Sequence, residues 1–469
     1  MFTEKKKTKI VATIGPVSDT PEKIERLLQL GVNVFRFNMK HNTVAWHEER
    51  INLVNSIAKK LDKSVGILVD LQGPELRLET ADKLPVLVKK GEEVVVGLNF
   101  DVPNAKIVLA EKSVYTTTNV GDQFLIDDGF GEFSVVWKGV DHLVIISNED
   151  YSISHRKGVN LPGANLEFSS LIPADLDKLD MATRVKVDFV ALSFCRSKSD
   201  LDLLKAEIAK RNLKVQIVAK IENGMALRNI EEITSNADAV MVARGDLGVE
   251  SPIEELAGWQ KRIVKICRFK HKPVIVATQM LQSMIENPRP TRAEATDVSN
   301  AVWDGTDAVM LSGESASGKY PEKAVEAMAK IVAFNETVIE DDDLELTTYD
   351  STEAVVSSAI SLARHQASVR AIVVFTDSGT TAKVLSSFRP KLPIIAIAHD
   401  PKVADLLSLS FGVTPLRKEF PTGEFKIPTE VIELLEKDGI LKKGDDVIIV
   451  HGSQWHEPGA TNAMALVKV

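Results

Sequence analysis

Cysteine is scarce in this sequence, which contains two cysteines among 469 residues. Both thiols, Cys195 and Cys267, stand beside apolar runs, without the spacing of a disulfide framework or the neighbours of a metal site. This pattern favours buried thiols in a reducing compartment. We therefore expect a cytoplasmic protein.

Long hydrophobic runs and an excess of positive charge are also missing. No uninterrupted apolar stretch reaches the ~20 residues that a membrane-spanning helix needs, and no leader-like apolar segment follows Met1. The net charge of -9 at pH 7 argues against a nucleic-acid-binding protein, whose basic face usually shows in its composition. The Lys5–Lys7 run is better explained as a solvated start of the chain. We predict neither membrane nor nucleic-acid partners.

The sequence does have the balance of a globular protein, with 44% hydrophobic and 26% charged residues. Its length suggests about three domains, or a large barrel carrying additions. A short β-branched apolar run, a polar turn and a helical segment recur along it, and eight such runs predict a closed (β/α)8 TIM barrel. The predicted strands are Lys9–Gly15, Asn33–Met39, Val65–Leu71, Phe189–Phe194, Gln216–Glu222, Ala239–Asp246, Pro273–Met280 and Ala308–Ser315.

Two segments depart from this repeat. Residues 74–161 show short alternating strands and glycine-rich turns with little helix, which predicts an inserted all-β domain, a β-barrel, after the third barrel strand. After the acidic run Asp341–Asp343, α/β alternation resumes in a second style over residues 343–469. The expected organisation is a catalytic barrel at 1–73 and 162–342, the β insertion, and a C-terminal α/β domain.

Polar side chains concentrate where catalysis occurs in such barrels, at the C-terminal ends of the strands. Ionisable or hydroxyl residues stand at seven of the eight predicted ends. They are Arg36 and Asn38, Asp70, Ser193, Lys220 and Glu222, Asp246, Thr278, and Ser312 with Glu314. A capping aspartate or an ion pair between strands explains any one of them, but not the series.

The best-defined group in this series is Lys220, Glu222 and Asp246. Lys220 and Glu222 are two residues apart on one strand and project to the same side, while Asp246 follows the adjacent strand. Two carboxylates suffice for Mg²⁺ (or Mn²⁺) when waters and substrate oxygens complete the shell. An ammonium beside that metal neutralises a transferring phosphoryl group, whereas the alternative is a buried structural Lys–Glu pair.

Several longer motifs resemble those of pyruvate kinases, in the same order and over essentially the whole chain. They are Thr8–Pro16, Lys157–Gly163, Ala219–Asn223, Met241–Gly248, Ala277–Met280, Pro288–Glu294 and Leu311–Glu314. The resemblance implies transfer of the phosphoryl group of phosphoenolpyruvate to ADP, giving pyruvate and ATP. It also implies a homotetramer and a mobile lid formed by residues 74–161.

The resemblance further implies a role for each matching residue. The implied catalytic residues are Lys220, Thr278 and Arg36. The implied phosphoenolpyruvate site is Arg36, Ser193, Lys220, Ala243, Arg244, Gly245, Asp246 and Thr278. The implied nucleotide-binding residues are Asn38, His41, Arg77 and Lys157. Glu222 and Asp246 would hold the divalent metal, and Asn38, Asp70 and the carbonyl of Leu71 a monovalent cation, usually potassium.

One departure from the family pattern falls in that monovalent site. Lys40 stands where the family has a cation-binding serine. Leu71, Gln72 and Leu78 resemble the potassium-independent branch, but Glu75 stands where that branch carries a lysine. We hypothesise that the Lys40 ammonium replaces potassium, bonded to Asp70 and Asn38. The alternative is that Lys40 swings toward solvent or nucleotide while potassium still binds.

The C-terminal domain carries a hydroxyl-rich loop between a predicted strand and helix, typical of a phosphate cradle. Its residues are Thr376, Ser378, Gly379, Thr380 and Thr381. In the resembling family this loop binds phosphorylated effectors, with a partner segment here at Gly452–Asn462 that includes His456. A capped helix start without a ligand is the alternative.

Two rival functions remain open. Other barrel enzymes of phosphoenolpyruvate and pyruvate chemistry share a Glu/Asp metal pair, but generally lack the insertion and the lysine equivalent to Lys220. A non-catalytic, metabolite-sensing relative is suggested by Lys40 and Asn42. The intact Lys220, Glu222, Asp246 and Thr278 speak against it.

Overall fold

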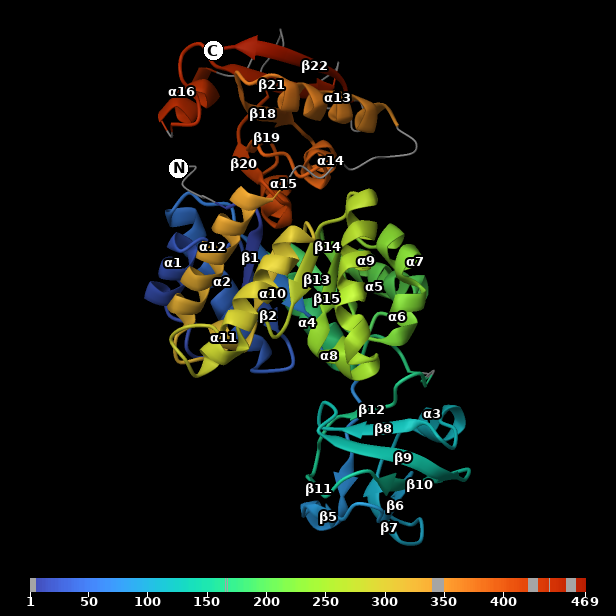
Figure 1. Ribbon diagram of the computed structural model, residues 1–469. Helices are drawn as coiled ribbons and strands as arrows, with labels where there is room; N and C mark the ends of the chain where they lie inside the picture. The colour runs from blue at the N-terminus through green and yellow to red at the C-terminus, as the bar shows by residue number, and fades with distance from the viewer. Residues whose placement is uncertain are drawn as a thin grey trace.

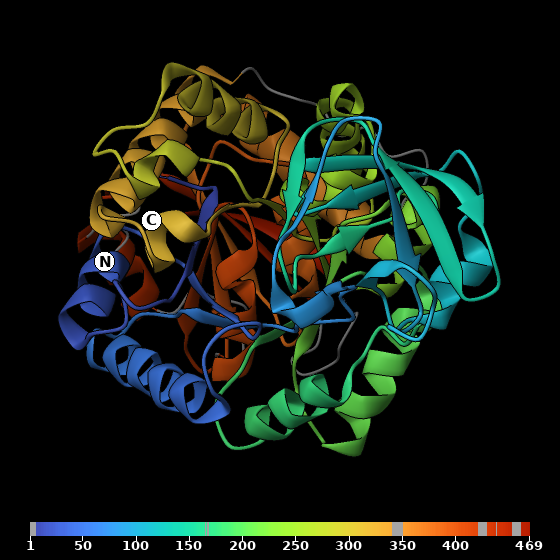
Figure 2. The same ribbon diagram turned by 90° about the horizontal axis from the view of Figure 1, so that it is seen from below.

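The computed structural model describes residues 6–164, 166, 168–339, 350–420, 429–437, 439–452 and 461–469. Three bodies lie in a row, with the β insertion at one end, a barrel in the middle and the C-terminal domain at the other end (Figure 1). Seen along the row, the insertion covers only part of the barrel end (Figure 2). Among the described residues, no helix combines the length and apolar character needed to cross a bilayer.

The central body is a closed parallel barrel, which confirms the predicted fold class. Its strands are β1 (Lys9–Thr13), β2 (Val34–Asn38), β3 (Gly66–Asp70), β13 (Phe189–Leu192), β14 (Gln216–Ile221), β15 (Ala239–Ala243), β16 (Val274–Ala277) and β17 (Ala308–Leu311). Their interior positions fill the barrel with small and branched side chains such as Val11, Val218 and Ala239.

Helices surround this barrel and bury an apolar stripe against its outer face. They are α1 (Pro21–Gln29), α2 (Val44–Lys60), α4 (Pro173–Ala182), α5 (Lys198–Lys210), α6 (Gly224–Arg228), α7 (Ile230–Asn236), α8 (Arg244–Glu250), α9 (Leu256–Phe269), α10 (Arg292–Trp303), α11 (Gly313–Ala316) and α12 (Pro321–Val338). Several start at a residue whose side chain caps the helix, as at Thr20 before α1 and Thr43 before α2.

The barrel floor, the end where the strands begin, carries a repeated cap. The residue before every second strand accepts a hydrogen bond from a backbone N–H of the preceding strand. The bonds are Ile10 N to Asn33 Oδ1 (3.0 Å), Ile67 N to Asp188 Oδ2 (2.9 Å), Ile217 N to Asp238 Oδ2 (2.9 Å) and Val274 N to Asp307 Oδ2 (3.1 Å). These bonds therefore join the eight strands in four successive pairs around the barrel.

Residues 74–161, called the lid below, carry two sheets. The larger sheet has seven strands and the smaller pairs β5 with β11. The elements are β4 (Glu79–Thr80), β5 (Val86–Val88), β6 (Glu93–Gly97), β7 (Ala105–Val108), α3 (Lys112–Thr117), β8 (Gln123–Ile126), β9 (Gly131–Lys138), β10 (His142–Ser147), β11 (Tyr151–Ile153) and β12 (Val159–Asn160). The insertion is built mainly of strands, as expected, while its closure into one β-barrel stays a prediction.

The C-terminal domain is a five-stranded sheet in the order β20-β19-β18-β21-β22, parallel except at β22. Its strands are β18 (Val369–Phe375), β19 (Ile394–Ala398), β20 (Val413–Arg417), β21 (Asp446–Gly452) and β22 (Thr461–Lys468). Its helices are α13 (Ser351–His365), α14 (Thr380–Ser387), α15 (Pro401–Leu406) and α16 (Thr429–Lys437). The α/β prediction for this region is confirmed.

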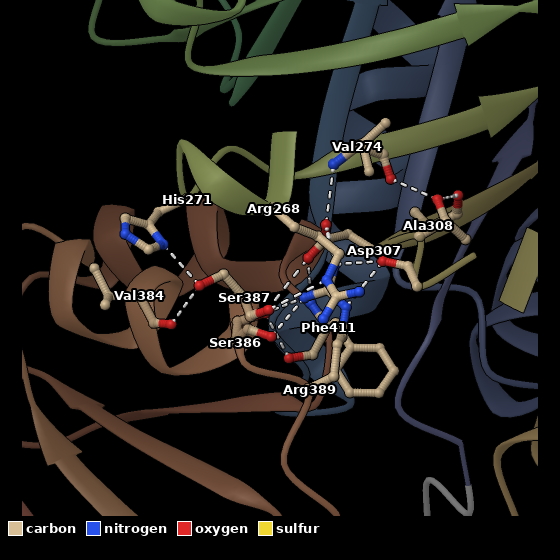
Figure 3. A network of polar contacts seen from close by, with 12 residues as sticks. Arg268, His271, Val274, Asp307, Ala308, Val384, Ser386, Ser387, Arg389 and Phe411 are labelled. Carbon is tan, nitrogen blue, oxygen red and sulfur yellow. Dashed lines mark hydrogen bonds and ion pairs between the residues drawn. The ribbon is translucent and has the colours of Figure 1, made fainter. Parts of the chain in front are cut away.

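The C-terminal domain docks on the barrel floor through buried charges. Arg389 Nη2 lies 2.7 Å from Asp307 Oδ2, and the backbone N–H of Phe411 donates to Asp307 Oδ1 at 3.0 Å (Figure 3). Lys402 pairs with Asp188 at 2.6 Å. Leu409 is buried in the same cluster as the barrel-interior side chains, so the domain also plugs the floor with an apolar group.

Candidate active site

The side chain of Lys220 lies at the centre of a buried polar cluster at the opposite end of the barrel. Its Nζ is 2.7 Å from Glu222 Oε1, 2.7 Å from Ser193 Oγ and 3.2 Å from Asp70 Oδ1. These partners lie at the ends of β14 itself, of its neighbour β13, and of β3, which is the next strand beyond β13 in the barrel. The structure thus brings together residues that the strand-end pattern grouped.

Arg36 extends this cluster to β2 and β1. Its Nε lies 2.7 Å from Asp70 Oδ2, and its Nη1 donates to Thr13 Oγ1 at 3.0 Å. Asp70 thereby receives a cation on each oxygen, from Lys220 and from Arg36. Two adjacent fixed cations, with one carboxylate between them, form a surface that attracts the phosphate or carboxylate of a small anion.

The charges of this cluster depend on one another. Burial favours the neutral form of Asp70, but the Lys220 and Arg36 charges outweigh it and lower the pKa of Asp70. Burial likewise opposes the charge of Lys220, yet Asp70 and Glu222 raise the pKa of its ammonium. Lys220 therefore stays positively charged at neutral pH.

Glu222 and Asp246 are the two carboxylates that the sequence pattern predicts for a divalent metal. Burial raises the pKa of Glu222, Lys220 works against that rise, and the nearby negative charge of Asp246 adds to it. A bound cation would relieve this repulsion. Within the described ranges no group of three or more His, Cys, Asp or Glu side chains could hold a metal alone. The pair therefore fits a metal that takes further oxygens from its substrate, as Mg²⁺ does.

The segment after β15 turns directly into α8, so Arg244, Gly245 and Asp246 start a helix. The backbone N–H of Gly245 donates to Thr278 Oγ1 at 2.7 Å, and that hydroxyl donates to the Ala277 carbonyl at 2.6 Å. Ala243 is buried beneath this turn. Arg244 turns away from the turn, held by Asp297 at 2.7 Å and by the Thr278 carbonyl at 2.8 Å.

The backbone is strained beside this turn. Thr278 and the following Gln279 have φ angles of +69° and +53°. Two successive non-glycine residues in this region cost free energy, and such strain persists mostly at functional sites. The contact with Gly245 fixes the Thr278 hydroxyl at the barrel mouth.

Lys40 is placed differently from the expectation. Its Nζ lies 3.9 Å from Glu75 Oε1 and 5.5 Å from the centre of the Phe194 ring. The expected bonds of this ammonium to Asp70 and Asn38 are not formed among the described residues. Asp70 is already occupied by Arg36 and Lys220, which explains the difference.

The three expected monovalent-cation ligands all accept hydrogen bonds or ion pairs from the protein. Asn38 Oδ1 accepts from the backbone N–H of Lys40 at 3.2 Å, and the Leu71 carbonyl accepts from Ser193 Oγ at 2.8 Å. Asp70 has the partners described above.

The predicted nucleotide residues lie in two places. Asn38 and His41 follow β2, with the His41 carbonyl accepting from Nε2 of the buried His47 at 2.8 Å. Arg77 and Lys157 lie at the base of the lid, paired with Glu75 at 2.8 Å and Asp127 at 2.7 Å. A cleft between lid and barrel is lined by Glu75, Gly158, Asn160 and Asp246 among others. It includes the sequence neighbours of Arg77 and Lys157, but none of the four predicted nucleotide residues lines it.

The predicted effector loop is a closed network of hydroxyls. Gly379 donates its N–H to Thr376 Oγ1 at 2.9 Å and has the positive φ of 86° that ends the turn before α14. Ser378 and Thr380 bond through their hydroxyls at 3.0 Å, and Thr381 bonds to Thr461 at 2.6 Å. His456 of the expected partner segment lies outside the described residues.

Sequence reasoning missed several residues that build the site. Thr13 orients Arg36, Asp297 anchors Arg244, and His47 supports the loop that carries Lys40 and His41. None stands at the end of a strand in a recognisable motif except Thr13, which closes β1. A polar residue inside a helix carries no pattern that marks its target.

Comparison with known proteins identifies relatives of the whole chain. Residues 5–325 match the family model for the pyruvate kinase barrel domain, and residues 353–467 match that for the pyruvate kinase alpha/beta domain. Pyruvate kinases of Staphylococcus epidermidis and Staphylococcus aureus are each 38% identical, over 98% of this chain and 80% of the relative. A pyruvate kinase structure from Cryptosporidium parvum superposes with a TM-score of 0.94 at 32% identity, covering 99% of this chain and 96% of that one. The chain belongs to the pyruvate kinase family of phosphotransferases.

Proposed function

We propose that this chain transfers the phosphoryl group of phosphoenolpyruvate to ADP at the Lys220 end of its barrel. The observation that carries this assignment is the buried cluster in which Lys220 and Arg36 face a common carboxylate, Asp70. Two cations held this way balance the negative charge of a phosphoryl group between donor and acceptor.

In the proposed step, a terminal phosphate oxygen of ADP attacks phosphorus while the bond from phosphorus to the enol oxygen breaks. Lys220 and Arg36 neutralise the oxygens of the transferring group. The enolate left behind takes a proton at carbon to become pyruvate, and Thr278, fixed by Gly245, lies on the proposed proton path. The substrate carboxylate lies against Ala243–Asp246, beside Ser193. A divalent metal on Glu222 and Asp246, Mg²⁺ or Mn²⁺, supplies charge neutralisation when bound.

A coupled assay for pyruvate tests this proposal. The protein with phosphoenolpyruvate, ADP and Mg²⁺ should release pyruvate and ATP in equal amounts, and Lys220→Met should lose activity by about 10³-fold or more. Pyruvate without ATP would point to another phosphoenolpyruvate enzyme. No turnover in either protein would point to a non-catalytic relative.

We further propose that this chain works without potassium. The expected ligands Asn38, Asp70 and Leu71 all have protein donors, and Lys40 already supplies a positive charge beside Glu75. A potassium ion would have to displace those donors and approach a fixed ammonium.

Activity without sodium or potassium tests this point. The wild type should retain most of its activity, whereas Lys40→Ser should gain a dependence on added potassium. Lys59→Ser, on the exposed face of α2, is the matched control and should leave both rates unchanged. Near-total dependence of the wild type on potassium would contradict the proposal.

Three further features are proposed with it. Asn38 and His41 of the barrel and Arg77 and Lys157 of the lid would bind the ADP phosphates. The Thr376–Thr381 loop would bind a phosphorylated effector once its hydroxyls exchange partners. The two buried, free thiols fit a cytoplasmic location, and the family resemblance implies a homotetramer. Titration of sugar phosphates against the substrate saturation curve tests the effector loop, and an unchanged curve favours a simple helix cap.

A further inference from the structure

The chain passes between barrel and lid twice, and the two passages are bonded to each other. The backbone N–H of Leu78 donates to Lys157 at 3.0 Å, and that of Val159 donates to Leu76 at 2.9 Å. Between them, Arg77 and Gly158 form an antiparallel bridge. We call residues 76–78 and 157–159 the neck ribbon. Because its two segments are hydrogen-bonded, they must move together with the lid.

Below the neck ribbon, one buried carboxylate holds both passages. Asp175 Oδ1 accepts from the backbone N–H of Gln72 at 2.9 Å, and Oδ2 accepts from Gly73 at 3.1 Å. Oδ2 also accepts from Ile172 at 3.2 Å, on the returning passage just before α4. The Asp175 side chain is fully buried. One side chain thus fixes the outgoing and the returning chain to the barrel.

Helix capping explains only part of this arrangement. Asp175 is the third residue of α4, where an acidic side chain normally bonds the backbone N–H at the helix start, here that of Ile172. The bonds to Gln72 and Gly73 lie outside that role and join residues about a hundred positions apart, 103 and 102. Burial raises the pKa of Asp175, while the three N–H groups oppose the rise. Burying the Asp175 carboxylate costs desolvation free energy. This cost favours a specific role for Asp175 beyond capping α4.

The chain between Asp175 and the neck ribbon is short and suited to bending. Gly73 has a φ of +67°, and a Cβ at this position would lie 2.9 Å from Cβ of Ser193. Pro74 follows and has no N–H to bond. On the outgoing passage, only Pro74 and Glu75 therefore separate Gly73, which Asp175 fixes to the barrel, from a ribbon that belongs to the lid.

We infer that Asp175 is a positioning residue that fixes the pivot about which the lid closes on the nucleotide. Its contact with Gln72 also anchors the end of β3, two residues beyond Asp70. Loss of this anchor would let the pivot drift, so that Arg77 and Lys157 no longer meet the nucleotide reproducibly. The inference rests on the proposed function, because it assumes that ADP binds between lid and barrel.

The test compares Asp175→Asn with Asp188→Asn. Asp188 is a matched control: it is also fully buried, its pKa is also raised by burial, and it accepts a backbone N–H at the start of the same strand, from Ile67 at 2.9 Å. Asn keeps one acceptor oxygen and loses the charge. Asp175→Asn should raise the KM for ADP about tenfold and leave the KM for phosphoenolpyruvate nearly unchanged. Asp188→Asn should lower Tm without changing either KM.

Amide hydrogen exchange gives a second readout that does not depend on activity. The Gln72 and Gly73 amides should exchange faster in Asp175→Asn and at the wild-type rate in Asp188→Asn. Equal KM values for ADP in the two variants would overturn the inference and leave Asp175 as a helix cap. An inactive wild type would instead refute the proposed function, while faster exchange would still support the anchor.

A second variant covers the case in which Asp175→Asn does not fold. Asp175→Glu keeps the charge and both oxygens but displaces them by one methylene. The same selective rise in the KM for ADP would support the pivot, and unchanged kinetics would overturn it.

Discussion

The two ends of the barrel handle buried charge in opposite ways. At the floor, each oxygen of Asp307 accepts a backbone N–H, and Arg389 adds a fixed cation. At the other end, Glu222 and Asp246 repel each other, and Lys220 and Arg36 crowd around Asp70. At Asp307 the protein itself compensates the buried charge, whereas the mouth is arranged for charges that arrive with a substrate. Buried charge alone therefore does not mark a catalytic site.

The largest expected effect is at the mouth. Glu222→Gln should lower kcat by about 10²–10³-fold and raise the Mg²⁺ concentration needed for half-maximal rate. The free energy of unfolding should fall less than in the floor variant Arg389→Met, because Lys220 keeps Asp70 as a charged partner at 3.2 Å. Steady-state kinetics across a Mg²⁺ series and urea unfolding measure the two. A loss of stability as large as that of a floor variant would contradict the proposed difference between the two ends of the barrel.

At the floor we expect a variant to lose stability while keeping its activity. Arg389→Met leaves the buried Asp307 charge without its cation and should lower the free energy of unfolding by about 3–5 kcal/mol. Turnover per folded molecule should stay within about twofold of the wild type. Arg370→Met is the control, because its pair with Asp445 at 3.5 Å is exposed and should contribute less than about 1 kcal/mol. A fall in kcat with unchanged stability would contradict this assignment.

The smallest effect concerns Lys383 of α14, whose Nζ donates to Gln216 at 3.1 Å at the same floor. Burial lowers its pKa to about 8, against the favourable charge of Asp238. Above that pH the folded protein has released a proton that the unfolded chain keeps up to about 10.5. The free energy of unfolding should therefore rise between pH 8 and 10, by roughly 2 kcal/mol.

Lys383→Met removes the titrating group and should abolish that rise. Urea unfolding of both proteins at several pH values between 7.5 and 10 measures the difference. Parallel curves for wild type and variant would show that Lys383 keeps its ordinary pKa.

The sequence predicted the barrel well because each strand is apolar on both faces, but its errors cluster at the site. The strand predicted over Ala239–Asp246 stops at Ala243, where α8 begins. The strand predicted over Pro273–Met280 stops at Ala277, before the strained Thr278. In both places the backbone is set by contacts between strand ends rather than by local preference.

Contacts between distant residues account for what the sequence did not yield. Lys40 was expected at Asp70, but the competition from Arg36 and Lys220 became visible only in three dimensions. The floor caps did leave a signal, because Asp188, Asp238 and Asp307 each stand directly before a barrel strand. Asp238 and Asp307 each begin the same tetrapeptide, Asp-Ala-Val-Met. Reading that repetition would have pointed to the floor.

The neck ribbon has a consequence for how the chain folds. β3 and β13 are neighbours in the barrel, yet the bond between Ile67 and Asp188 joins residues 121 positions apart. Closing so long a loop is slow and entropically costly when it is flexible. A lid that folds first brings its two ends together at the ribbon, so that only residues 68–75 and 160–187 remain in the loop. The folded insertion would then lower the entropic cost of pairing β3 with β13, so that the barrel closes faster as the chain emerges during synthesis.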